Sequence, residues 1–355
     1  MAKPKYPIID GHNDVAQYLY LPEKLPGYMF TKENAGACLD AQKARKGGFK
    51  GGFFAVFNPP MRSEVISDQA TYRALGFRIP PFPSLPHSRA QQQTIEGIVE
   101  LLRLEKDPEA GIIIVRTLTD LVNSLETDKI AAILHLEGAE AIDAKLNALE
   151  VFYQSGLRSV GITWSRPNIF GHGVPFKYPS RPDIGPGLTT LGKKLVRRCN
   201  EMGIMIDLAH LNEKGFWDVA ELSNAPLVST HTAAYSLCES SRNLTDKQID
   251  AIGHSGGLIG INFYVADLRE DGEDNSDMPL TRIVEHVKYI ADRIGIDHVA
   301  LGSDFDGALM PNDLNSADKL PNLIAAFEEA GFSESDLQKI THKNWIRILY
   351  HTWHE

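Results

Sequence analysis

"YPIIDGHND", residues Tyr6 to Asp14, is a short apolar run that stops on a histidine between acidic residues. Short apolar runs with β-branched residues are typical of strands that helices cover on both faces. Asp10, His12 and Asp14 stand at the carboxyl end of this predicted strand. Because barrel enzymes build their active sites at the carboxyl ends of their strands, the stretch predicts a buried strand that ends in a chemical site.

Seven similar runs follow, with segments of helical periodicity between them. Eight strands alternating with helices predict an α/β fold, a distorted (β/α)8 TIM barrel that forms one domain over residues 1–355. A doubly wound open sheet is the alternative. The predicted strands are 7–10, 52–57, 130–136, 159–164, 204–209, 227–230, 257–263 and 298–302.

A ninth apolar run, 111–115, lies between two helical stretches, 88–106 and 117–125. Since the barrel needs only eight strands, we expect the ninth to be an extra edge strand. Two proline-rich segments, 78–88 and 175–187, are predicted to be structureless insertions at the mouth of the barrel. The apolar residues of "FPSLPHS" in the first insertion are expected to be exposed, where they can join an interface or cover a neighbour's site.

Composition, charge and cysteine use limit the possible partners. The chain is 43% hydrophobic, and its 36 basic and 46 acidic residues give a net charge of -10, so neither nucleic acid nor an anionic membrane is an expected partner. No apolar run is long enough for a secretory signal or a membrane span. Cys38, Cys199 and Cys238 form no CxxC pair, which predicts no disulfide framework. We therefore expect a cytoplasmic protein.

Polar residues follow five of the predicted strands, at carboxyl ends that meet on one face of a barrel. Taken singly, each has an ordinary structural role, as a cap, a turn or a buried histidine bonded to a carbonyl. Together, and without a cysteine, they match the ligands of a catalytic pair of zinc ions, which needs a bridging carboxylate and generates hydroxide. The five residues that match these ligands are His12, Asp14, Glu137, His210 and His231, and Asp304 and Asp306 are the acidic residues after the last strand.

Eight motifs in chain order carry a resemblance to the renal or membrane dipeptidase family. The chain resembles these zinc metallopeptidases, which have amidohydrolase-like barrels, from residue 6 to residue 350. The motifs are "IIDGHND", "LHLEGAEAI", "YQSGLRSVGITW", "MIDLAH", "LVSTHTAAYS", "SSRNLTD", "GGLIGINFY" and "HVALGSDFDG".

The resemblance implies a metal centre with two Zn2+ ions per chain. His12 and Asp14 would bind one ion, His210 and His231 would bind the other, and Glu137 would bridge the two. The same resemblance implies a homodimer.

Three further residues receive roles from the resemblance. Asp304 would handle the substrate's amino group or pass a proton to the leaving amine, and Arg242 would hold the substrate carboxylate, which suits its planar fork. Tyr264 would form part of the pocket wall. Without the family pattern, Asp304 would be interpreted as a strand-end cap, Arg242 as a surface residue and Tyr264 as a packing residue.

One position departs from the family pattern. Where the family carries a histidine after the fourth strand, this chain reads "GITWSRPN", with Trp164 at the expected position and Asn168 downstream. An indole donates one hydrogen bond but accepts no proton, so it cannot replace an imidazole. His172, eight positions on, is the candidate replacement at the substrate.

Three functional hypotheses follow. The first is a dipeptidase in which a metal-bridging hydroxide attacks the peptide carbonyl, Asp304 returns a proton to the leaving nitrogen and Arg242 anchors the carboxylate. The second keeps the metals but acts on a modified amino acid, as a deacylase, a lactonase or a tailoring enzyme, and Trp164 is its support. The third is a barrel without catalysis that serves as a binding protein.

Overall fold

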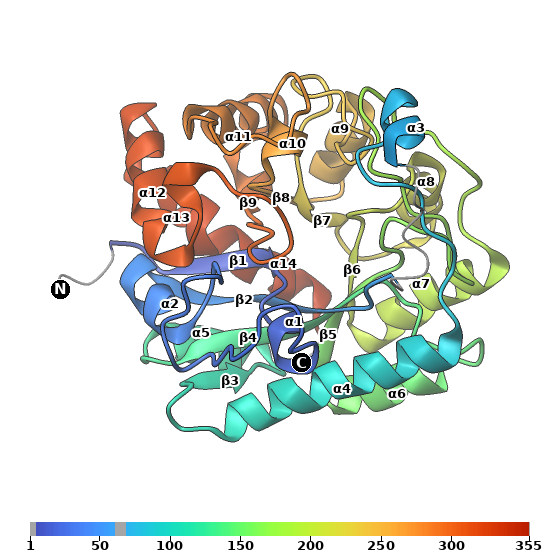
Figure 1. The fold of residues 1–355 in the computed structure, drawn as a ribbon, viewed down its shortest axis with the longest axis horizontal. Helices are drawn as coiled ribbons and strands as arrows, with labels where there is room; N and C mark the ends of the chain where they lie inside the picture. Colours follow the sequence, from blue (N-terminus) through green and yellow to red (C-terminus); the bar gives the residue numbers. More distant parts are fainter. Residues whose placement is uncertain (1–4, 61–68, 355) are drawn as a thin grey trace.

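Parallel strands arranged in chain order form a nearly closed barrel in the computed structural model, which describes residues 5–60 and 69–354 (Figure 1). Where the last strand meets the first, the backbone N–H of Asp304 donates to the carbonyl of His12 at 3.0 Å. The predicted (β/α)8 fold is confirmed. The strands are β1 (Ile8–Asn13), β2 (Phe49–Phe57), β4 (Ile130–Glu137), β5 (Leu157–Gly161), β6 (Met205–Asp207), β7 (Val228–Thr232), β8 (Leu258–Ile261) and β9 (Val299–Leu301).

The ninth strand, β3 (Ile112–Ile114), lies outside this path and pairs only with β4. Because β2 pairs along one whole edge of β4, β3 and β5 share the other edge. β3 takes the first residues of that edge and β5 takes over from Leu134. The prediction of an extra edge strand is therefore confirmed.

Helices surround the barrel, with α4 running along its lower edge in Figure 1 and α11 along its upper edge. Side-chain caps begin several of them, as where Asp40 accepts hydrogen bonds from two backbone N–H groups at the start of α2. In the described part of the chain, every helix is too short or too polar to cross a membrane. The helices are α1 (Gln17–Tyr20), α2 (Ala41–Gly47), α3 (Gln69–Ala74), α4 (His87–Lys106), α5 (Leu118–Leu125), α6 (Asn147–Gln154), α7 (Thr190–Met202), α8 (Glu213–Leu222), α9 (Asp246–His254), α10 (Val265–Leu268), α11 (Thr281–Ile294), α12 (Leu320–Glu329), α13 (Glu334–Gln338) and α14 (Asn344–Thr352).

The last helix fills part of the barrel interior. α14 packs Trp345 against strand residues such as Ile9 and Phe53, and the indole donates to the carbonyl of Leu301 at 3.0 Å. Gly11 has no room for a side chain, because a Cβ there would clash with this indole and with a β7 carbonyl. The barrel interior around this indole is therefore packed, whereas a cavity lies at the carboxyl ends of the strands.

The proline-rich segments border the mouth of the barrel as predicted, because Ile79 and Phe176 line its cavity. The expectation that "FPSLPHS" exposes apolar residues is wrong, since Phe82 and Leu85 are only 8% and 9% exposed. Phe82 stacks on Trp164 with ring centroids 5.5 Å apart. The segment folds inward because the mouth itself offers an apolar surface to cover.

Candidate active site at the carboxyl ends of the strands

The five predicted metal ligands meet around one carboxylate oxygen. Oε1 of Glu137 lies 2.9 Å from Nε2 of His210, 3.7 Å from Nε2 of His231 and 3.8 Å from Nε2 of His12. Oδ2 of Asp14 is 3.4 Å from Nε2 of His12. The ligand atoms form two clusters, each within 4.8 Å across, and Glu137 belongs to both.

Irregular pairing accompanies two of the three histidines. Between Asp10 and Asn13, β1 has one residue more than β2 has between Gly52 and Phe54. β7 likewise has an extra residue between Ser229 and Thr232 relative to β8, in the stretch that contains His231. Such bulges bend a strand and redirect its side chains, and they are common beside active sites. We attribute the inward direction of His12 and His231 to them.

Strained backbone marks the same region. Among the described residues, four non-glycine residues have positive φ, and three of these belong to the site: His210 (63°), Asp304 (62°) and Asp306 (68°). Left-handed backbone costs energy in residues with a Cβ and persists where the surroundings enforce it. Asp306 is held there because its carboxylate accepts from the backbone N–H groups of Cys38 and Leu39 at 2.6 and 3.1 Å.

The three imidazoles differ in their second contacts. Nδ1 of His210 is 2.7 Å from the hydroxyl of Ser165, and Nδ1 of His231 is 2.8 Å from the hydroxyl of Thr230. Both ring nitrogens of His12 are buried without a hydrogen-bond partner in the described chain. Its ring packs instead against that of His231, with centroids 3.8 Å apart.

Burial and crowded charge shift the titration of these groups. Burial is the main cause that raises the pKa of Glu137 well above its usual range, and the nearby charge of Asp14 is the second cause. Burial alone would lower the pKa of His12, but the carboxylates of Asp14 and Glu137 outweigh it and raise the pKa to about 10. Burial, with the charges of Arg242 and His12, holds the pKa values of His210 and His231 well below the usual range.

The residues fit metal ions by their own chemistry. Nε2 of His210 and Nε2 of His231 approach to 3.0 Å, a natural arrangement for two lone pairs that face a shared cation. Two buried carboxyl groups lie beside these neutral imidazoles, and the ring nitrogens of His12 have no hydrogen-bond partner in the described chain. Nitrogen and carboxylate ligands of this kind suit zinc and neighbouring divalent metals.

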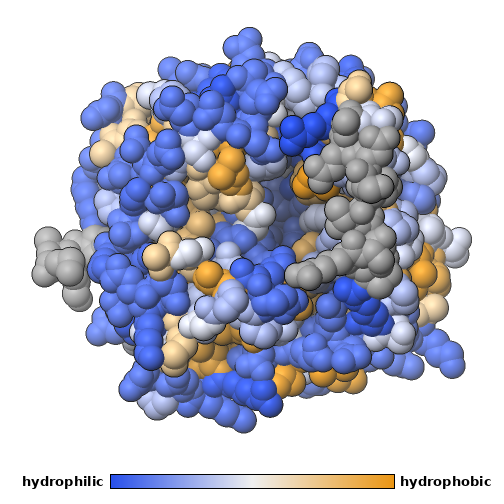
Figure 2. Space-filling view, in the orientation of Figure 1, coloured by the Kyte–Doolittle hydropathy of each residue, from blue (hydrophilic) through white to orange (hydrophobic). Residues whose placement is uncertain are grey.

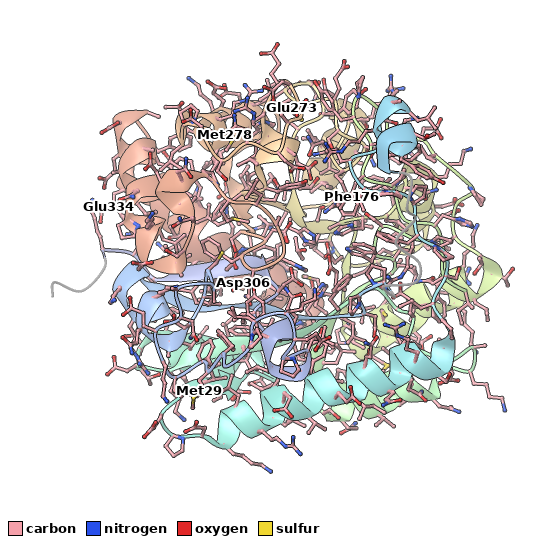
Figure 3. The ribbon with its side chains drawn as sticks, viewed as in Figure 1. Met29, Phe176, Glu273, Met278, Asp306 and Glu334 are labelled. Carbon is pink, nitrogen blue, oxygen red and sulfur yellow. The ribbon has the colours of Figure 1, made fainter. Side chains whose placement is uncertain are left out.

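A cavity of about 180 Å³ opens above the ligands, where Figure 2 shows a hollow near the centre of the face. Asp14, Glu137 and His210 line its floor, and Asp304 and Arg242 line its sides. Asp306 and Phe176, labelled in Figure 3, also line this cavity and come from different parts of its rim.

Beside the metal ligands, Asp304 and Arg242 are two of the charged residues that line this cavity, with Lys24, Asp267 and Asp306. Burial raises the pKa of Asp304 to about 7. The charge of His12 lowers this pKa, and the charge of Asp14 raises it further. Arg242 is 5% exposed, and its guanidinium bonds to the carbonyl of His231 at 3.3 Å. Its Nε has no hydrogen-bond partner in the described chain, so the guanidinium keeps capacity for an anion.

The remaining predicted substrate residues divide into two groups. Tyr264 and Trp164 line the cavity, and the Tyr264 hydroxyl donates to Asp274 at 2.7 Å. His172 is not among the residues that line it, and its carbonyl accepts from the N–H of Asn212 at 3.2 Å. Asn168 holds the loop after β5, since its amide bonds to the carbonyl of Ile162 at 2.8 Å.

Trp164 belongs to an apolar wall, the cluster of Phe57, Phe82, Trp164 and Phe176. The Trp164 ring lies 4.9 Å from that of Phe57 and 6.0 Å from the imidazole of His210, measured between centroids. Part of the cavity lining beside the ligand cluster is therefore aromatic.

Two buried residues near the metal ligands were missed in the sequence. His135 packs its ring edge-on against His12 with centroids 5.4 Å apart, and Asp207 lies with His12 and His231 in a third cluster of possible ligand atoms. His135 stands two residues before Glu137, so the two-residue alternation of a strand puts both on one face and could have found it. No comparable signal marks Asp207.

Fold and site together define a class, the metal-dependent hydrolases built on a (β/α)8 barrel. The chain belongs to the membrane dipeptidase family, peptidase family M19, whose model matches residues 3–353. It is accordingly a metallopeptidase and depends on metal.

Known relatives match nearly the whole of this chain. A crystal structure of the dipeptidase AC, a metallopeptidase of family M19, is 40% identical with a TM-score of 0.91, over 98% of this chain and 99% of that one. A metallopeptidase from Rhodobacter sphaeroides, crystallised with a phosphinate mimic of the dipeptide L-Ala-D-Ala, is 41% identical with a TM-score of 0.90 over the same shares. Dipeptidase tcpJ of Claviceps purpurea is 30% identical over 96% of this chain and 76% of its own length.

Proposed function

We propose that this chain is a binuclear zinc dipeptidase that hydrolyses the peptide bond of a free dipeptide. The observation that carries the proposal is the position of Glu137, whose Oε1 lies within 3.8 Å of three imidazole nitrogens at the floor of a cavity. His12 and Asp14 would hold one ion, and His210 and His231 the other. Zinc held there would supply a shared hydroxide at neutral pH and polarise the peptide carbonyl.

Asp304 is the proposed proton carrier. It lines the cavity beside the ligand clusters, and burial raises the pKa of its carboxyl to about 7. A group with a pKa near the working pH can both hold a proton and release it, which suits transfer to a leaving amine. Its left-handed backbone, anchored by the bond from its N–H to the carbonyl of His12, keeps the carboxyl at the rim.

Arg242 is the proposed anchor of the substrate carboxylate. Its guanidinium is buried at the cavity wall and retains an unpartnered Nε. A planar fork that meets a carboxylate forms charge-assisted hydrogen bonds of fixed geometry. With a fixed anchor at one side and the ligand cluster at the floor, the distance between them selects for chain length.

The size of the cavity supports a small substrate. About 180 Å³ is below the roughly 300–1,000 Å³ of pockets that take drug-sized ligands. The Trp164 side of the cavity is apolar, so we expect dipeptides with an apolar side chain to be preferred. The relative crystallised with a mimic of L-Ala-D-Ala supports a dipeptide as the substrate class.

A second candidate, hydrolysis of an N-acyl amino acid, is favoured by the same wall. Trp164 cannot exchange a proton with the scissile group, and Phe57 and Phe176 extend the apolar surface on which an acyl chain would pack. The carboxylate of such a substrate would use Arg242 in the same way.

One set of assays tests both candidates. Purified protein is loaded with zinc, its metal content is measured by elemental analysis, and hydrolysis is followed for three substrate sets. The sets are dipeptides with L or D residues at the second position, N-acyl amino acids and long peptides. We expect two zinc ions per chain and cleavage of dipeptides alone. Activity only on N-acyl amino acids selects the second candidate, and efficient cleavage of internal bonds in long peptides contradicts both.

A further inference from the structure

We propose that Asp207 is a positioning residue, which acts through Thr230 to hold His231 in the tautomer that presents a free Nε2 to the metal. The inference rests on the proposed role of His231 as a zinc ligand. All three residues are buried, at 1%, 0% and 0% exposure, so solvent cannot replace the contacts among them.

Two backbone N–H groups and one side-chain hydroxyl engage both carboxylate oxygens of Asp207. Its Oδ1 accepts from the N–H groups of Ala209 and Thr230 at 3.0 and 2.8 Å. Its Oδ2 accepts from the Thr230 hydroxyl at 2.6 Å. With both oxygens engaged, Asp207 is a poor direct metal ligand, although it lies in one cluster with His12 and His231.

The direction of the next hydrogen bond follows from the single proton of a hydroxyl. A carboxylate offers only acceptors, so the Thr230 proton points to Asp207. The Thr230 oxygen can then only accept from Nδ1 of His231, which lies 2.8 Å away. Nδ1 therefore carries the ring proton, and the Nε2 lone pair faces Glu137 and His210.

The other two imidazoles lack such a device. Ser165, the partner of His210, has no second hydrogen-bond partner in the described structure, so its hydroxyl can donate or accept. Neither ring nitrogen of His12 has a partner there. Of the three proposed histidine ligands, only His231 has its tautomer imposed by the protein.

The isosteric variant Asp207→Asn reverses the chain of hydrogen bonds. The two backbone N–H groups at Oδ1 keep the amide oxygen on their side, so the amide NH2 faces the Thr230 hydroxyl. The hydroxyl must then accept from the amide and donate to Nδ1 of His231. The ring proton moves from Nδ1 to Nε2, with no change in net charge on the imidazole, and it occupies the atom that would bind the metal.

The test measures tautomer and zinc affinity separately from activity. Protein labelled with 15N-histidine is examined by NMR without metal, and the His231 signals are assigned from their absence in His231→Asn. Zinc affinity is measured by competition with a chelator. We expect the Nδ1–H tautomer in the unaltered protein and the Nε2–H tautomer in D207N, with one zinc ion bound about 10 to 100-fold more weakly.

Two matched variants complete the test. Thr230→Ser keeps the hydroxyl and should retain the tautomer and both zinc ions. Ser159→Ala removes a buried hydroxyl that bonds to Nδ1 of His135 at 2.9 Å, and it should leave zinc affinity unchanged. Should D207N fail to fold, Thr230→Ala replaces it, since this change removes the hydroxyl and leaves the backbone bonds to Asp207.

The outcomes separate this inference from the proposed function. An unaltered protein that binds no zinc overturns the proposed metal centre itself. Two zinc ions bound with unchanged affinity in D207N or T230A, or an unchanged His231 tautomer in D207N, overturn the positioning role alone.

Discussion

The two halves of the proposed metal centre share Glu137 but are built differently. In the β6–β7 half, His210 and His231 each have Nδ1 within 2.8 Å of a buried hydroxyl. In the β1 half, the ring nitrogens of His12 have no hydrogen-bond partner in the described structure, and carboxylates raise its pKa to about 10. One half is positioned by directed hydrogen bonds, and the other by packing and charge.

This difference has a physical consequence. Hydrogen bonds between neutral hydroxyls and Nδ1 hold an imidazole whether or not a metal is bound. The β1 half instead places an imidazole near Asp14 and Glu137, two carboxyl groups that repel each other in their charged forms unless a cation lies nearby. Without metal, the raised pKa of His12 favours its protonated form, which would supply that cation. The predictions below separate the two halves.

The largest effect is expected where the halves meet. Replacement of Glu137 by glutamine removes the carboxylate shared by both clusters, so both ions should be bound more weakly. We expect kcat/KM to fall by more than about 10³-fold, beyond the loss of one electrostatic donor. Zinc content and dipeptide kinetics measure it, with exposed Glu239→Gln as the control. Two retained ions at an unchanged rate would contradict the shared role.

Asp304→Asn should separate proton transfer from metal binding. Asp304 is absent from the ligand clusters, so both zinc ions should remain, while kcat falls about 10² to 10⁴-fold because an amide cannot deliver the proton. Elemental analysis beside steady-state kinetics gives both readouts, and exposed Asp313→Asn serves as the control. A lost zinc ion would instead make Asp304 a ligand of the β1 half.

Arg242→Lys tests substrate binding on the side of the β6–β7 half, where Arg242 bonds to the carbonyl of His231. Loss of the planar fork should raise KM about 10 to 100-fold, equivalent to one charged hydrogen bond, with a smaller effect on kcat. Dipeptide amides, which lack the terminal carboxylate, should be cleaved equally by both forms. If the KM of Arg242→Lys for the amides is still higher than that of the unaltered protein, the anchoring role is wrong.

Ser165→Ala removes the only hydrogen-bond partner of Nδ1 of His210 in the described structure. We expect about 10-fold weaker binding of one zinc ion and unchanged binding of the other, because this hydroxyl makes no hydrogen bond to the β1 half in the described structure. Chelator competition resolves the two affinities. Equal weakening of both ions would show that the halves are not independent.

The smallest expected effect is the binding of one proton by His12 in the metal-free protein. Metal-free protein at pH 8 should carry one imidazolium among the three histidines, at His12, because its pKa is raised to about 10 while those of His210 and His231 are lowered. This charge contributes fully to the stability of the metal-free fold at pH values below 6.5, the ordinary pKa of histidine. The contribution is lost as the pH rises through about 10. 15N NMR of labelled histidines detects it, and three neutral rings would contradict it.

Much of the site was predictable because its residues end predicted strands. His12, Glu137 and Asp304 stand where apolar runs stop, and the ends of parallel strands meet at one end of a barrel. The sequence also predicted the extra strand β3 from its position between two helical segments. Local periodicity was sufficient for these features, since each depends on a few neighbouring residues.

Contacts between distant segments were not predictable in this way. Phe82 was expected to be exposed, but the ring of Trp164, far along the chain, offers it an apolar partner. Asp207 stands in an ordinary buried strand, and its importance depends on a hydroxyl 23 positions away. Neither position carries a local pattern that distinguishes it from ordinary core or loop residues.

By itself, the sequence determined the order of the strands, the chemical types of the proposed ligands and their placement at strand ends. Only the tertiary structure decided that β1 and β7 contain an extra residue beside His12 and His231, and which hydroxyl meets which imidazole. The reason is that side-chain periodicity is a property of one strand, whereas bulges and hydrogen-bond partners arise from the register between strands.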